Sequence, residues 1–259
     1  MSRTLLLKSM EQTPLYNTVN FDMTPDYGFG VAANSTAVGT IITAYLCPSD
    51  PNSGAYRNNN YHACYGTTTH GFSNTTRLVG NGMFAAWSTY GPSSVTDGLS
   101  QTIAFSEALV GSTSGGTNCR GNTVSMGGTR NDIVDARADL TGVNALLSQC
   151  AQSFQAGSAT VVNDLRGARW ASGRTGWTMF NALQTPNDSP YRFNGCRVGC
   201  VGCGLEAGFS FPATSQHSGG VNVLMGDGSA RFVKDSVDRN TWYSLSSRDG
   251  AEIVSSDGY

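Results

Sequence analysis

The stretch "GVNVLMGDGSARFVKD", residues 220–235, constrains the fold of this chain more than any other segment. It contains two runs of β-branched and apolar residues joined by Asp227-Gly228. An Asp-Gly pair between such runs favours a two-residue type I′ turn, which needs positive φ at both central positions. The stretch therefore predicts an antiparallel β-hairpin. With Asp227 and Gly228 as the turn, we expect one buried face made of Val221, Val223, Met225, Ala230 and Phe232.

His217 lies ten positions before Asp227, and the spacing decides whether these two residues can form a catalytic pair. A straight strand of ten residues spans roughly 33 Å, at about 3.3 Å per residue. We therefore expect no catalytic contact between them. Asp227 and Gly228 are interpreted as turn residues, and His217 is expected to pack or hydrogen-bond at the entrance of the first strand. All three are predicted to form a structural motif.

The rest of the chain predicts several short strands and few helices, an α+β fold in one domain over residues 1–259. Expected helices cover residues 3–12, 14–20, a segment capped by Asn34 or Ser35 that runs to Ile42, 139–151, and a last one capped near Ser236 or Asp238 and ended by Gly250. Expected strands are "AYLCPSDP", "NYHACYG", "QTIAFSEALV", "ARWAS" and "GWTMFNAL". Residues 110–132 contain few large apolar side chains, so they predict a Gly/Ser-rich surface excursion.

The charge of the chain argues against nucleic acid and anionic membranes as partners. Charged residues make up 13% of the sequence, and the net charge is −2. Its two lysines are Lys8 and Lys234, so it has no basic patch of the kind that binds phosphates. The apolar run Leu5 to Leu7 is too short for a signal peptide or a membrane span. We therefore expect no membrane span in this chain.

Seven cysteines in a lysine-poor chain are typical of disulfides formed in an oxidising compartment. An odd number leaves one free or bonded to another chain. The spacing of "CRVGCVGC", residues 196–203, also suits an iron–sulfur cluster, or a zinc site with an added histidine, but a disulfide-bonded loop is favoured. The cysteines expected to form disulfides, save the odd one, are Cys47, Cys64, Cys119, Cys150, Cys196, Cys200 and Cys203.

The sequence predicts a non-catalytic protein without a cofactor or metal. It lacks the short motifs of serine hydrolases, zinc proteases and nucleotide-binding enzymes. Asp97 and Glu107 could in principle act as paired carboxylates on a glycoside, but a turn residue and a strand-end residue are the commoner interpretation. Three sequons for glycosylation, as short motifs that also arise by chance, begin at Asn34, Asn74 and Asn187.

The spacing from His217 to Asp227-Gly228 resembles the signature of the bacterial H-x9-DG domain family. Further blocks resemble that family in order, namely "MEQTPLYNTVNF", "AYLCPSDP", "VTDGLSQTIAFSEALVG", "RGARWASG", "FNALQTPNDSP" and "RDGAEIVS". The family is a domain of unknown function in prepilin-like, type II secretion pseudopilin-like proteins. Its members typically begin with a prepilin leader and a long hydrophobic helix, which this sequence does not show.

The resemblance implies a pseudopilin-like globular head and transfers no catalytic residues. It suggests an exported structural subunit, extracellular or at the cell surface, that associates with copies of itself as a homo-oligomer or fibre. The alternative is a secreted carbohydrate- or ligand-binding module, in which exposed Trp87, Trp170 and Trp177 would form a platform for glycans, but a core position is the commoner interpretation of each.

Overall fold

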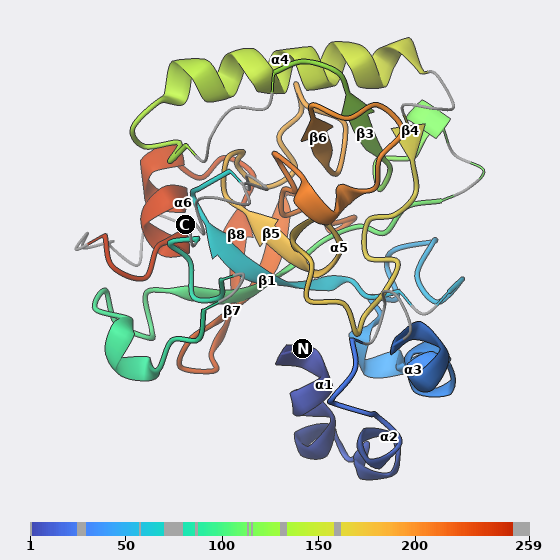
Figure 1. The fold of residues 1–259 in the computed structure, drawn as a ribbon. Helices are drawn as coiled ribbons and strands as arrows, with labels where there is room; N and C mark the ends of the chain where they lie inside the picture. The colour runs from blue at the N-terminus through green and yellow to red at the C-terminus, as the bar shows by residue number, and fades with distance from the viewer. Residues whose placement is uncertain are drawn as a thin grey trace.

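The computed structural model describes residues 2–24, 30–56, 58–69, 80–85, 88–112, 114, 116–129, 134–157 and 162–250. It has an α+β fold with two sheets, a mostly antiparallel one of five strands and a mixed one of three (Figure 1). Short 3-10 helices join several of the elements. Three of these 3-10 helices are η3 (Pro92–Ser94), η4 (Gly116–Asn118) and η5 (Leu205–Ala207), and the other two belong to the N-terminal region described next.

The N-terminal helices gather at one end of the molecule, away from the two sheets (Figure 1). They are α1 (Ser2–Leu6), η1 (Leu7–Met10), α2 (Thr13–Asn17), α3 (Gly30–Gly39) and η2 (Thr43–Tyr45). Leu7, Val38, Ile42 and Tyr45 pack with Trp170 in a small apolar cluster. The predicted strand at "AYLC" is wrong, because Tyr45 ends a 3-10 helix.

Helix α3 begins earlier than the sequence predicted. Asn34 and Ser35 were expected to cap it, but both lie inside the helix. The side chain of Asn34 instead accepts a hydrogen bond from Asn20 N (2.8 Å) and donates one to Asn20 O (3.0 Å). Asn34 is therefore a buried residue that hydrogen-bonds the backbone of a neighbouring loop, and it does not cap the helix.

The five-stranded sheet has the strand order β5-β1-β2-β7-β8. Its strands are β1 (Tyr61–Gly66), β2 (Ile103–Glu107), β5 (Met179–Asn181), β7 (Gly220–Met225) and β8 (Ala230–Lys234). All neighbours are antiparallel except β1 and β5. Strands predicted in "NYHACYG" and "QTIAFSEALV" are confirmed as β1 and β2. "GWTMFNAL" is half right, because a helical turn, α5 (Thr175–Thr178), precedes β5.

The segment "ARWAS" was predicted to be a strand and is not one. Its Trp170 is fully buried in the N-terminal cluster, where its indole Nε1 donates to the carbonyl of Thr40 (2.9 Å). The apolar residues that suggested a strand therefore serve packing between distant segments.

The hairpin of β7 and β8 is confirmed, but its register differs by one residue from the prediction. Val221 pairs with Val233, and Leu224 pairs with Ala230. The loop has three residues, because Met225 N donates to Ser229 O and Gly228 N donates to Met225 O. A type I turn followed by a left-handed glycine gives this loop, and Gly228 has φ 89°.

The one-residue shift reverses the faces of β8. Val221, Val223 and Met225 are buried as predicted, but Ala230 and Phe232 are exposed on the opposite face. Side chains alternate along a strand, so a loop with one extra residue moves all of them to the other side.

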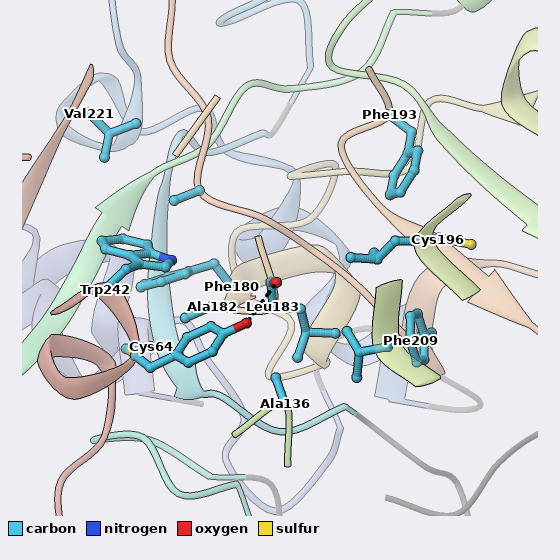
Figure 2. Packing of buried hydrophobic residues seen from close by; sticks show 14 of the residues in the cluster. Cys64, Ala136, Phe180, Ala182, Leu183, Phe193, Cys196, Phe209, Val221 and Trp242 are labelled. Atoms are coloured by element: carbon cyan, nitrogen blue, oxygen red, sulfur yellow. Dashed lines mark hydrogen bonds between the residues drawn. The ribbon is translucent and has the colours of Figure 1, made fainter. Parts of the chain in front are cut away.

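The main core lies against this hairpin and its neighbours. Helix α6 (Arg239–Ser246), capped by Asp238 as predicted, brings Trp242 against Phe180 of β5, with the rings stacked 5.9 Å apart. Figure 2 shows these two rings beside Cys64 and Leu183. The helix ends at Ser246, short of the predicted Gly250.

The three-stranded sheet has the order β4-β3-β6 and contains β3 (Thr123–Met126), β4 (Val162–Asn163) and β6 (Cys196–Val198). Helix α4 (Leu140–Ala156), capped by Asp139, lies across it (Figure 1). The prediction that residues 110–132 form a surface excursion is wrong in part. This range contains β3, which is buried and is the central strand of the three-stranded sheet. Long-range pairing with β6 supplies the burial that local composition did not indicate.

Candidate functional site

The two ends of the β7–β8 hairpin contain the residues of the predicted structural motif. At the turn, Asp227 Oδ1 accepts hydrogen bonds from Ser229 N (2.9 Å) and Ser229 Oγ (2.7 Å). These hydrogen bonds lower the pKa of the Asp227 carboxyl. Asp227 thus stabilises its own turn. His217, before the start of β7, has different partners.

His217 lies in a cluster with Cys47 and Glu107, and this cluster is the candidate functional site. His217 Nε2 is 3.1 Å from Glu107 Oε1 and 3.8 Å from Cys47 Sγ. The three donor atoms all lie within 4.8 Å of one another. Cys47 and Glu107 are buried, while the His217 side chain keeps 35% of its surface exposed. The site is thus open to solvent on the histidine side.

Pairing between β2 and β7 orients the carboxylate of Glu107. Glu107 ends β2, and Asn222 lies in the neighbouring strand. The backbone N of Asn222 donates to Glu107 Oε2 (2.8 Å), and Asn222 Nδ2 donates to Glu107 Oε1 (3.1 Å). Both carboxylate oxygens therefore have a fixed direction before any ligand arrives.

A buried polar network fixes the loop that carries Cys47. The backbone N of Cys47 donates to Asn60 Oδ1 (3.0 Å). Asn60 Nδ2 donates to Asp50 Oδ2 (2.8 Å), and the same oxygen accepts from Val110 N (2.9 Å). Asp50 and Asn60 are almost fully buried. Such a satisfied network holds its members rigidly, because breaking it leaves buried groups unpaired.

The cluster does not have the geometry of a catalytic triad. In a Cys-His-carboxylate triad, one ring nitrogen of the histidine faces the nucleophile and the other faces the carboxylate. Here Cys47 and Glu107 both face Nε2 of His217. The three atoms are close enough together for a single ion to contact all of them.

The cluster also affects a neighbouring phenol. Burial, followed by the charges of Cys47 and Glu107, raises the pKa of Tyr61. The phenol of Tyr61 therefore lies close to both acidic members of the cluster.

The structure pairs four of the seven cysteines, as Cys150–Cys196 and Cys200–Cys203. Three bridges were expected, and this is wrong, because Cys47, Cys64 and Cys119 are free thiols. Cys196 bonds to Cys150 of α4, so it is not available with Cys200 and Cys203 for a cluster or a zinc ion. The two disulfides are typical of an oxidising environment.

The free thiols have different surroundings. Cys64 is fully buried in β1, and this burial raises its pKa to about 12. Cys119 is half-buried near Asn52. Cys47 is the free thiol that lies beside a histidine and a carboxylate.

In two of the three sequons, the asparagine side chain is hydrogen-bonded to another part of the protein. Asn34 is buried and hydrogen-bonded to Asn20, which argues against a glycan at this position. Asn187 donates from Nδ2 to Asp235 Oδ1 (2.8 Å), which argues against modification of the same nitrogen. Asn74 lies outside the described residues.

Two of the three tryptophans considered as a glycan platform are core residues, which is the interpretation that the sequence favoured for each. Trp170 and Trp177 are both buried. Trp87 lies outside the described residues. Asp97 and Glu107, considered as a carboxylate pair, have different partners. Asp97 Oδ2 accepts a hydrogen bond from Gly250 N (2.8 Å), whereas Glu107 contacts His217.

Cys47 and Glu107 were not recognised as partners of His217 from the sequence. Cys47 and His217 are 170 residues apart, and neither lies in a local metal-ligand spacing with Glu107. The sequence contained only indirect signs of this cluster, namely that His217 precedes one strand and Glu107 ends another. The hydrogen-bonding role predicted for His217 at the strand entrance agrees with its contact to Glu107.

Within the described residues, we find no helix with the length and apolarity that crossing a membrane requires.

Comparison with known proteins identifies a family but no characterised relative. No curated protein and no solved structure matches the chain. A family model described as "Protein of unknown function (DUF1559)" matches residues 2–240. That match spans the N-terminal helices, both sheets and the start of α6. The chain therefore belongs to the DUF1559 family, whose function is unknown.

Proposed function

We propose that this protein is an exported, non-catalytic structural subunit, extracellular or at the cell surface, whose copies associate through the free edge of the five-stranded sheet. The observation that carries the proposal is β8, which among the described strands pairs only with β7. An edge strand offers unpaired backbone groups to another strand unless charge, proline or a covering element protects it.

Support also comes from the apolar side chains beside this edge. Phe232 of β8 is 43% exposed, and Leu224 of β7 is 39% exposed. They lie on the same outer face of the hairpin, because the observed register places Phe232 opposite Asn222 and Leu224 opposite Ala230. A second chain would remove this apolar surface from water.

The charges of β8 are compatible with pairing between two copies. An antiparallel contact centred on Phe232 places Lys234 opposite Ala230 of the second copy and Arg231 opposite its Val233. No like charges then lie directly opposite each other, which would destabilise the pair. Phe232 faces its own counterpart, an aromatic cross-strand pair of the favourable kind.

The edge contact proposed here has two-fold symmetry, so by itself it makes dimers. A fibre needs a second, different contact on each chain, because only a contact that does not close gives an open polymer. The pseudopilin-like character and the H-x9-DG relationship suggested by the sequence belong to this proposal. The two disulfides support export, because such bonds persist in oxidising compartments.

Sedimentation velocity at increasing protein concentration, without reductant, tests the proposal. We expect dimers or larger species for the unaltered protein and monomers for Phe232→Lys, because a lysine in the middle of an edge strand blocks pairing. Val201→Lys is the matched control, since it adds the same charge at an exposed apolar residue outside the five-stranded sheet. A strictly monomeric protein contradicts the proposal, as does an equal loss of association in both variants.

A further inference from the structure

We propose that Cys47, Glu107 and His217 form a binding site for a divalent zinc-type cation, with three protein ligands and a fourth position open to water. The site is independent of the proposed self-association, because the three ligands and the atoms that orient them belong to one chain. It also gives His217 a role that its position before a strand does not reveal.

Two of the three distances between the donor atoms are close to those of tetrahedral coordination, and all three are within 4.8 Å. Zinc binds sulfur at about 2.3 Å and nitrogen or oxygen at about 2.0–2.2 Å. At tetrahedral angles, these bond lengths place neighbouring ligand atoms roughly 3.3–3.6 Å apart. His217 Nε2 is 3.1 Å from Glu107 Oε1 and 3.8 Å from Cys47 Sγ. Shifts of a few tenths of an ångström would bring both pairs to these values.

The ligand atoms favour zinc over calcium or magnesium. Thiolate and imidazole are ligands of zinc and of softer transition metals, whereas calcium and magnesium prefer oxygen ligands alone. One sulfur, one nitrogen and one oxygen make a set in which three protein ligands leave the fourth position to solvent. The exposed side of His217 provides that access.

The surroundings of the ligands are already ordered for binding. Asn222 holds both oxygens of Glu107, and Asn60 holds the backbone of Cys47. The backbone N of His217 donates to Ser215 Oγ (3.0 Å), which fixes the start of its segment. Groups that orient metal ligands typically contribute 10–100-fold to metal affinity.

The charge of a divalent cation also matches these ligands. Glu107 and Cys47 are both buried, and a divalent ion balances the charges of one carboxylate and one thiolate bound to it. It would tie together the loop after η2, the end of β2 and the segment before β7, three regions that are distant in sequence.

Metal titration of the full chain tests the site. The protein is stripped with a chelator, kept without reductant and without oxygen so that the disulfides and the free thiols both persist, and titrated with zinc and with cobalt(II). We expect one ion per chain. Bound cobalt should show a thiolate-to-metal charge-transfer band and the strong visible bands of a tetrahedral ion.

Three variants and one matched control separate this site from incidental binding. Cys47→Ser should lose the charge-transfer band, and His217→Ala should lose tight binding of both ions. Asn222→Ala should bind zinc about tenfold more weakly, because one hydrogen bond to Glu107 is lost while the backbone bond remains. Cys119→Ser removes a free thiol outside the cluster and should bind as the unaltered protein does.

The proposal is overturned if the unaltered protein binds no zinc or if Cys47→Ser and Cys119→Ser bind it equally. Cobalt binding without a thiolate band in the unaltered protein also overturns it. Circular dichroism checks that each variant is folded. If Cys47→Ser does not fold, His217→Ala decides, because its half-exposed side chain can be truncated with less disturbance of the core.

Discussion

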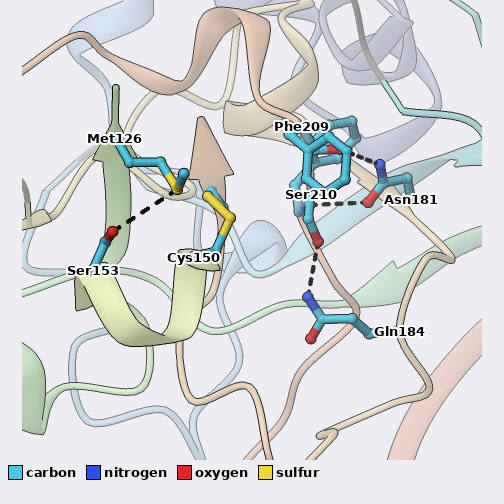
Figure 3. Close-up of a disulfide and its surroundings, with 9 residues drawn as sticks. Met126, Cys150, Ser153, Asn181, Gln184, Phe209 and Ser210 are labelled. Carbon is cyan, nitrogen blue, oxygen red and sulfur yellow. Dashed lines mark hydrogen bonds between the residues drawn. A yellow bond between two sulfur atoms is a disulfide. The ribbon is translucent and has the colours of Figure 1, made fainter. Parts of the chain in front are cut away.

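The two sheets of this protein are stabilised in different ways. The five-stranded sheet has strands of three to six residues, and apolar residues of β1, β2, β5, β7 and β8 pack with α6 in the main core. The three-stranded sheet has strands of two to four residues and is joined to α4 by the Cys150–Cys196 disulfide (Figure 3). Residues of β3, β6 and α4 belong to the same buried cluster as those of the five-stranded sheet, and in the smaller sheet a covalent bond to the covering helix adds to that burial.

The cysteines show the same contrast. Cys64 of the five-stranded sheet is fully buried and reduced, while Cys196 of the three-stranded sheet is fully buried and oxidised. A buried cysteine can thus act as a small apolar residue in one sheet and as a cross-link in the other. The five predictions below compare the two sheets and the elements packed on them.

The largest effect is expected from removing the bond between α4 and β6. The double variant Cys150→Ala/Cys196→Ala should lose about 2–4 kcal/mol of unfolding free energy, because the bond closes a loop with a sequence separation of 46 residues. Equilibrium urea denaturation measures this loss. Hydrogen exchange should show β3 and β6 opening before β1 and β2.

The matched control for that variant is Cys200→Ala/Cys203→Ala. This bond spans a sequence separation of 3, so less chain entropy is recovered when it is removed. Equal losses in the two double variants would show that the longer link has no special role in the smaller sheet.

A smaller effect is expected at the hairpin loop of the five-stranded sheet. Gly228 has φ 89°, so Gly228→Val should cost about 1–2 kcal/mol through left-handed backbone strain. The space around the position is open, so no clash contributes. Thermal unfolding measures the loss. A comparable loss in His217→Ala, with zinc removed, would contradict the assignment of strain to the turn.

The helix caps allow a direct comparison of α6 with α4. Asp238 accepts from Asn240 N and Thr241 N, whereas Asp139 accepts from Gly142 N. Each change to alanine should cost about 1 kcal/mol, with the larger loss at Asp238 because two donors lose their partner. Urea denaturation of both variants gives the two values. A larger loss at Asp139 would mean that α4 depends on its cap more than on its disulfide.

The smallest effect at neutral pH concerns the thiol of Cys64. Its pKa is raised from 9.0 to about 12, so it should resist alkylation of the folded protein at pH 8, while Cys119 reacts. In denaturant without reductant, three thiols per chain should react. Alkylation followed by mass spectrometry of peptides counts and locates them.

The same raised pKa predicts a loss of stability in alkali. The unfolded chain releases the Cys64 proton above about pH 9, but the folded chain holds it until about pH 12. Stability should therefore fall as the pH rises through this window. Cys64→Ala should weaken the dependence, and an unchanged slope in that variant would contradict the assignment to Cys64. Burial also raises the pKa of Tyr65 to about 12, so Tyr65 should contribute to the pH dependence that remains in Cys64→Ala.

Prediction from sequence succeeded where pattern and burial agreed locally. β1, β2, the hairpin and α4 each had enough regular apolar residues to be recognised. β3 was missed because "TVSM" lies in a polar stretch and is buried through pairing with β4 and β6 and packing against α4, all distant in sequence. The hairpin register was missed because one hydrogen bond, from Met225 N to Ser229 O, decides between a two-residue and a three-residue loop.

The sequence by itself determined that this chain has an α+β fold, a C-terminal hairpin followed by a helix, few charges and cysteines suited to disulfides. Local periodicity and turn chemistry act over a few residues, so they can be recognised without knowing the fold. Only the tertiary structure decided which cysteines pair and that Cys47 meets Glu107 and His217. Those contacts join segments up to 170 residues apart, and their distances depend on how β2 and β7 pair and on the buried network around Asn60.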